Sequence, residues 1–79
     1  MALPLDKLDD AEAWVSNDKI GKKLRQFYQE GNPNNTLYHI RGVVDGHLVL
    51  RYYRSGKGWK YLCESYFWVH AMAECLTLE

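Results

Sequence analysis

"HIRGVVDGHLVLRYY" (His39–Tyr53) decides the fold, because it predicts two strands joined by a tight turn at the "DG" pair. Two turn geometries fit this stretch. A two-residue turn pairs Val44 with His47 and mixes apolar and basic side chains on both hairpin faces. A three-residue turn with a bulge at Gly46 pairs Val43 with His47 and places the apolar and the basic side chains on opposite faces of the hairpin. Because burial of one face specifies strand register, we expect the bulged turn.

The bulged register gives the hairpin an apolar face and a basic face. The apolar face carries Tyr38, Ile40, Leu48, Leu50 and Tyr52. The basic face carries His39, Arg41, Val43, His47, Val49, Arg51 and Tyr53. Alternating polar residues are typical of a half-solvated antiparallel sheet. Arginines beside aromatic rings are also typical of surfaces that bind phosphates and stack bases, so both interpretations stay open.

A third strand follows the turn "RSGKG" at residues 54–58. Pairing Arg54 with Trp59 directs Cys63 into the core and places Lys60 and Glu64 on the basic face. The tail after Tyr66 has a helix-forming composition, although residues near Trp68 fit a strand equally well.

Two N-terminal segments read as helices. Residues 7–15, "KLDDAEAWV", carry acidic residues at the N-terminal end, where the helix dipole favours them. Residues 19–30, "KIGKKLRQFYQE", space their apolar residues as an amphipathic helix does. The predicted fold is therefore α+β: N-terminal helices packed on a three-stranded antiparallel meander, with a C-terminal segment that is helical. The 79 residues form a single domain, 1–79.

The aromatic content of 14% exceeds what a core of this size hides. The segment "YFWVHAM" would be apolar on both faces as a strand, which suggests either that a partner covers one side or that the tail folds back over the sheet. The residues expected at an oligomer or partner contact are Trp59, Tyr66, Phe67 and Trp68. A homodimer is the expected assembly.

The zero net charge conceals a basic middle and acidic ends. Nine of the ten Lys and Arg residues lie at positions 19–60, together with only two of the ten acidic residues. The candidate anion or nucleic-acid face comprises His39, Arg41, Arg51 and Lys60 of the sheet and Lys19, Lys22, Lys23 and Arg25 of the second predicted helix. The neutral total argues against a dedicated nucleic-acid binder, which is typically basic overall.

No motif for catalysis, a cofactor or a metal is present. Cys63, His70 and Cys75 lack the close cysteine pair of zinc sites, and no nucleophile elbow or phosphate loop occurs. We therefore expect a non-enzyme without cofactor or metal. The sequence shows no signal peptide or membrane-spanning run, so we expect a cytoplasmic protein with reduced thiols.

Residues 37–69 add a resemblance, carried by "YHIRGVVDG", "VLRYY" and "GWKY". This part of the chain resembles small uncharacterised proteins of mobile elements, such as integron gene cassettes and phages. The resemblance implies a bacterial origin, an α+β fold and self-association, and it brings no catalytic residues.

Three functional hypotheses follow. The first is a non-enzymatic protein-interaction module that self-associates through its surplus aromatic residues. The second is nucleic-acid or other polyanion binding through the basic sheet face and the basic helix stripe. A small-molecule enzyme comes third.

Overall fold

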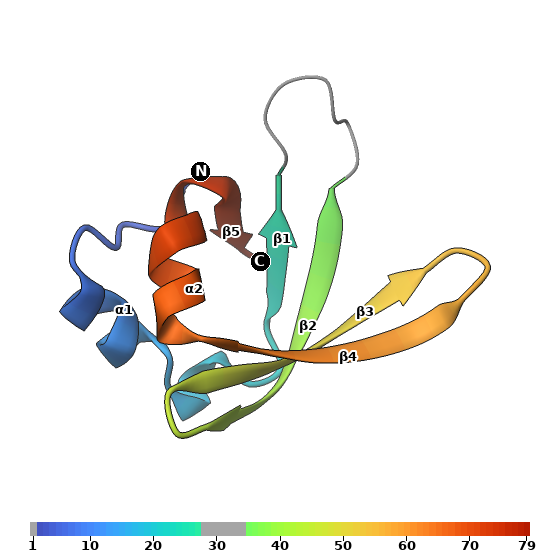
Figure 1. Ribbon diagram of the computed structural model, residues 1–79, viewed down its shortest axis with the longest axis horizontal. Helices are drawn as coiled ribbons and strands as arrows, with labels where there is room; N and C mark the ends of the chain where they lie inside the picture. Colours follow the sequence, from blue (N-terminus) through green and yellow to red (C-terminus); the bar gives the residue numbers. More distant parts are fainter. Residues whose placement is uncertain (1, 28–34) are drawn as a thin grey trace.

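A five-stranded antiparallel sheet forms the centre of the computed structural model, which describes residues 2–27 and 35–79. The strands lie in the order β4-β3-β2-β1-β5, so the last strand returns to pair with the first (Figure 1). The elements along the chain are α1 (Leu8–Trp14), η1 (Asn17–Lys19), β1 (Lys23–Gln26), β2 (Thr36–Val44), β3 (His47–Arg54), β4 (Gly58–Ser65), α2 (Tyr66–Met72), η2 (Ala73–Cys75) and β5 (Leu76–Leu78).

The predicted α+β arrangement of N-terminal helices on a three-stranded meander is wrong. The described residues hold five strands, and the fold is mostly β with short helices. The main error is the helix expected at 19–30. Gly21 has a φ of +91°, which a helix does not tolerate, and β1 begins two residues later at Lys23. Residues 28–30 of that predicted helix lie outside the described part of the chain.

Strand β1 forms because its side chains alternate between two environments. Leu24 and Gln26 are buried, whereas Lys23 and Arg25 lie on the opposite face. The backbone of β1 pairs with β2 on one side and β5 on the other. Tertiary pairing on both edges thus overrides the helical spacing of the apolar residues.

The turn between β2 and β3 has two residues, so the expected bulge at Gly46 is wrong. Asp45 and Gly46 have φ values of 49° and 72°, and Val44 pairs with His47. The bulge lies inside β2 instead, where the register shifts between Ile40 and Gly42. It separates apolar from basic side chains as expected, but Val43 pairs with Leu48 and packs against the core.

The pairing of β3 with β4 differs by one residue from the prediction. Arg54 pairs with Gly58, and Tyr53 pairs with Trp59. Glycines at 56 and 58 with positive φ support the observed turn, which is one residue shorter than the predicted turn. As a result Leu62 packs against the core, and Cys63 is exposed on the opposite face.

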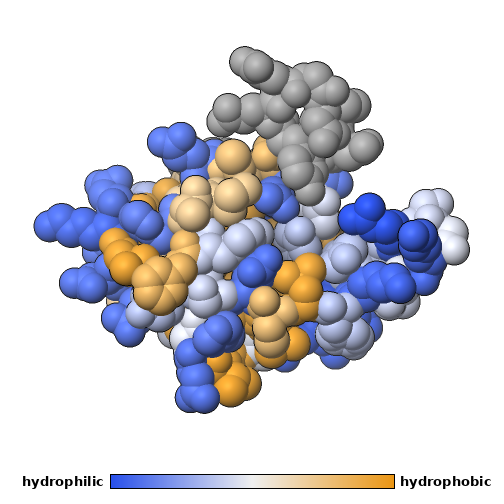
Figure 2. Space-filling model, in the orientation of Figure 1, coloured by the Kyte–Doolittle hydropathy of each residue, from blue (hydrophilic) through white to orange (hydrophobic). Residues whose placement is uncertain are grey.

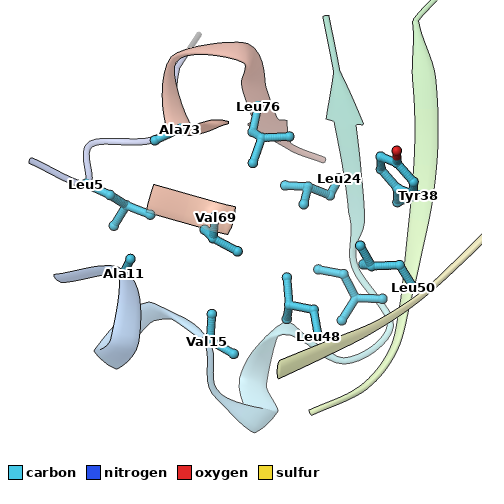
Figure 3. Packing of buried hydrophobic residues seen from close by; sticks show 11 residues of the cluster. Leu5, Ala11, Val15, Leu24, Tyr38, Leu48, Leu50, Val69, Ala73 and Leu76 are labelled. Carbon is cyan, nitrogen blue, oxygen red and sulfur yellow. The ribbon is translucent and has the colours of Figure 1, made fainter. Parts of the chain in front are cut away.

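One face of the sheet, the covered face, packs against α1, α2 and the N-terminal segment. Figure 3 shows Val69 of α2 amid the labelled cluster, with Ala11 and Leu5 on one side and Leu24 and Leu48 on the other. The largest fully buried side chains are Leu24, Ile40, Leu48, Leu50, Leu76 and Val69. Each contributes about 1.5–3 kcal/mol by burial, so this layer holds the helices on the sheet.

The C-terminal segment is helix first and strand last, which resolves the ambiguity near Trp68. Helix α2 begins directly after β4, and η2 leads the chain into β5. The amide of Phe27 donates to the carbonyl of Cys75 at 2.7 Å, and Leu3 donates to Ala73 at 3.0 Å. These backbone hydrogen bonds attach the C-terminal segment to the rest of the chain.

Candidate functional site

The sheet face opposite the helices, here called the open face, carries basic and aromatic side chains. Strand alternation places on it Lys23 and Arg25 of β1, Leu37 and His39 of β2, Val49, Arg51 and Tyr53 of β3, Trp59, Tyr61 and Cys63 of β4, and Thr77 with Glu79 at the C-terminus. Tyr53, Trp59 and Tyr61 are 60%, 49% and 61% exposed. Large rings left this accessible on a small domain make this face a candidate contact surface.

Trp59 is the centre of an aromatic cluster built from three neighbouring strands. The rings of His39 and Tyr53 meet it edge-on, with centroids at 5.7 and 5.4 Å. The guanidinium carbon of Arg51 lies 4.1 Å from the Trp59 ring centroid. Such a cation–π contact attracts the guanidinium to the indole ring and fixes its position beside Trp59.

Arg51 has a hydrogen-bond donor for which the described part of the chain provides no acceptor. Its Nε is buried and has no acceptor there. A buried donor without an acceptor costs about 1–3 kcal/mol. Phosphate geometry suits the planar fork of an arginine, but this Nε becomes available to a ligand only when the side chain moves.

The electrostatic potential at His39 is positive. Burial lowers the pKa of His39, and the charges of Lys23, Arg51 and Arg41 lower it further. Arg41 is the extra residue of the β2 bulge and is exposed. Among the described residues, no carboxylate pairs with any of these three cations. The centre of the open face therefore attracts anions.

Arg25 differs from these cations because it is already neutralised. Its Nε and Nη2 donate to the Glu79 carboxylate at 2.5 and 3.3 Å. This contact lowers the pKa of Glu79 and ties the C-terminus to β1. The free positive charge lies at Lys23, Arg41 and Arg51, towards the aromatic cluster.

The structure divides the predicted anion-binding residues into two groups. His39, Arg51, Lys23 and Arg25 share the open face, with Arg41 at its bulge. The remaining three lie elsewhere: Lys60 pairs with Tyr52 on the covered side of the sheet, Lys19 pairs with Asp18, and Lys22 precedes β1. The predicted helix stripe does not exist, since its four residues lie in η1, in β1 and, for Lys22, in the segment between them.

The predicted oligomer residues do not form one surface. Trp68 is partly buried, and its ring meets Tyr38 edge-on at 6.1 Å. Phe67 is 57% exposed and stacks on Tyr66 at 4.6 Å, at the start of α2. Trp59 belongs to the open face.

Sequence reasoning missed Tyr61 and Cys63 as members of the open face. The predicted pairing of Arg54 with Trp59 directed Cys63 into the core and, by strand alternation, Tyr61 as well, because this pairing lies one residue too far along β4. The available signal was the second glycine of "SGKG", since Gly58 at positive φ ends a three-residue turn.

Figure 2 shows the hydrophobic residues of the face in view as separate patches among hydrophilic ones. The tip of the β3–β4 hairpin, at the right of the view, is strongly hydrophilic.

A shallow depression of about 410 Å³ lies between the N-terminal segment and η2, with His70 and Cys75 in its lining. Residues 2–27 and 35–79 contain no cluster of three metal-ligating side chains and no helix able to span a membrane.

Comparison with known proteins identifies no relative: no family model, curated protein or solved structure is significantly similar to this chain.

Proposed function

We propose that the chain is a non-enzymatic binding module whose open face binds single-stranded nucleic acid. The observation that carries the proposal is the Trp59 cluster, in which an exposed indole holds Arg51 and adjoins Tyr53 on a face with free cations. This is the second hypothesis from the sequence, and the geometry of the open face favours it over the first.

Exposed rings provide stacking sites for bases. Tyr53, Trp59 and Tyr61 come from adjacent strands and remain about half exposed or more. Base–aromatic stacking contributes about 1–3 kcal/mol per base and tolerates any sequence. A duplex hides the faces of its bases, so these rings favour a single strand.

Cations supply the second requirement, which is contact with the phosphate backbone. Lys23, Arg41 and Arg51 are the charges that converge near His39. Three phosphate contacts give a salt slope of about −2 for a single strand, which weakens binding roughly 20-fold between about 50 and 200 mM salt.

The test is a fluorescence-anisotropy titration with a labelled thymidine oligonucleotide of roughly 12 nucleotides. We expect binding at low salt with that slope, weakened by Arg51→Ala and by Trp59→Ala. The matched controls are Lys7→Ala, an exposed cation beside α1, and Phe67→Ala, an exposed ring on α2. Absence of binding at low salt, or equal losses in the controls, would refute the proposal. A second titration with an RNA oligonucleotide of the same length compares the two affinities and shows whether the protein recognises the 2′-hydroxyl.

The cytoplasm is the compartment that we propose for this module. Cys63 is a free, exposed thiol and Cys75 is also unpaired, which suits a reducing environment. Single-stranded nucleic acid is accessible in the same compartment. The resemblance to mobile-element proteins stays a prediction.

A further inference from the structure

Strand β4 is a long edge strand. Its eight residues pair with β3, and within the described residues no strand lies on its other side (Figure 1). The opposite edge of the sheet, β5, has three residues. An unprotected long edge presents unpaired N–H and C=O groups to another strand. Lysines and inward-pointing charges usually protect such edges, and β4 carries Lys60 and Glu64 on its covered side.

These two charges protect the edge against most partners but not against a second copy of β4. In a two-fold antiparallel pair, the axis passes through one residue, and residues equally distant from it face each other. An axis at Lys60 or at Glu64 sets like charges directly opposite each other. An axis at Leu62 instead sets Lys60 opposite Glu64 of the second copy, twice over.

We propose that two copies of the chain associate through β4, antiparallel and centred on Leu62. In this register Tyr61 faces Cys63 of the second copy, and Trp59 faces its Ser65. All of these pairs have side chains on matching faces, as strand pairing requires. The open faces of the two copies then form one continuous surface.

The state of the two charges in the single chain supports this register. Neither Lys60 nor Glu64 has an ion-pair partner among the described residues. Glu64 is partly buried, and this burial raises the pKa of its carboxyl. An ammonium opposite the carboxylate offsets that desolvation, and opposite charges across paired strands stabilise a sheet.

Charge reversal tests the interface by sedimentation velocity under reducing conditions, from low to high micromolar concentration. Pairing through a single edge buries little surface, so we expect micromolar association of the native chain. Lys60→Glu and Glu64→Lys should each weaken it roughly ten-fold or more, because two attractive pairs become repulsive. The double variant Lys60→Glu/Glu64→Lys should associate as the native chain does.

Mixing the two single variants gives the sharpest result, since each supplies the charges that the other needs. We expect mixed dimers from chains that are monomeric separately. Lys57→Glu, a reversal in the hairpin turn outside β4, is the matched control and leaves association unchanged. A native chain that stays monomeric at high micromolar concentration would overturn the proposal. So would single variants that dimerise normally, or a folded double variant that stays monomeric.

Cross-linking provides a second readout that does not depend on charge. Residues directly opposite across antiparallel strands have Cα atoms about 4.5–5.5 Å apart, within the range of a disulfide. Leu62→Cys, in a chain with Cys63→Ser and Cys75→Ser, should therefore form a covalent dimer on mild oxidation. Phe67→Cys in the same background is the exposed control. Failure of Leu62→Cys to cross-link in a chain that sediments as a dimer would exclude this register.

Discussion

Individual residues of the open face gain their properties from neighbours that lie far away in the sequence. His39 contacts Trp59 and lies among the charges of Lys23, Arg51 and Arg41, which come from three different segments. No local pattern around His39 contains this information. The histidine therefore reports directly on whether the open face is assembled as described.

His39 should make stability depend on pH in the mildly acidic range. Burial and the three cations disfavour its protonated form, so the pKa of His39 in the folded chain lies below the ordinary value of 6.5. The unfolded chain takes up the proton first as pH falls. The free energy of unfolding should thus be highest above about pH 6.5 and decrease as pH falls through the folded-state pKa.

Two measurements check this expectation. An NMR titration of the imidazole gives the pKa of His39, and Arg51→Gln should raise it by removing one of the cations. Urea unfolding at several pH values should show that His39→Gln removes this pH dependence, whereas His47→Gln, at the β2–β3 turn, retains it. A pKa of His39 at or above 6.5 would contradict the proposed convergence of charge.

At the scale of the elements, the sequence predicts the hairpin well and the strand partners of β1 poorly. The apolar face of Tyr38, Ile40, Leu48, Leu50 and Tyr52 follows from alternation, because burial selects one face. The position of the compensating bulge does not follow, since a bulge at Arg41 and one at Gly46 sort the side chains almost equally. Only the tertiary structure distinguishes the two.

Strand β1 was beyond prediction for a related reason. Its four residues, Lys23–Gln26, carry a helical spacing with their neighbours and an alternating pattern among themselves. Its partners are β2 and the last residues of the chain, so its stability comes from contacts distant in sequence. The sequence named part of the candidate site: His39, Arg41, Arg51, Lys23 and Arg25 as anion-binding residues, and Trp59 as a partner contact. Placing Trp59 and Tyr61 of β4 on the same face as these cations required the correct turn.

Thiol reactivity tests the pairing of β3 with β4. The observed register exposes Cys63 on the open face, while Cys75 in η2 is partly buried. In chains with one cysteine each, made by Cys75→Ser and Cys63→Ser, the Cys63 thiol should react several-fold faster with an aromatic disulfide reagent. The measurement belongs at low protein concentration, where β4 is not paired with a second copy. Equal rates in urea provide the control. Protection of Cys63 in the native monomer would instead support the register expected from the sequence.

At the scale of the whole molecule, the charge is segregated rather than balanced. The acidic residues Asp9, Asp10 and Glu12 belong to α1 in the helical layer, whereas Lys23 and Arg51 lie on the opposite side of the sheet. A chain of zero net charge can therefore present a positive surface to a polyanion while its helical layer faces away. Local charge at the contact, not the total, determines attraction at distances near the Debye length.

The pairing of β5 with β1 at the edge of the sheet stabilises the fold that keeps the acidic helical layer and the basic open face on opposite sides. Leu76 is fully buried, and β5 connects the C-terminus to β1 beneath the helices. Leu76→Ala should lower the free energy of unfolding by about 2–5 kcal/mol, a large fraction of the roughly 5–15 kcal/mol typical of a small domain. Glu79→Gln removes the exposed ion pair with Arg25 and should change stability little, because solvent screens such pairs. Urea unfolding of both variants compares the two contributions. Equal losses would contradict this expectation, because they would mean that the surface ion pair contributes as much as the buried leucine to holding β5 against the sheet.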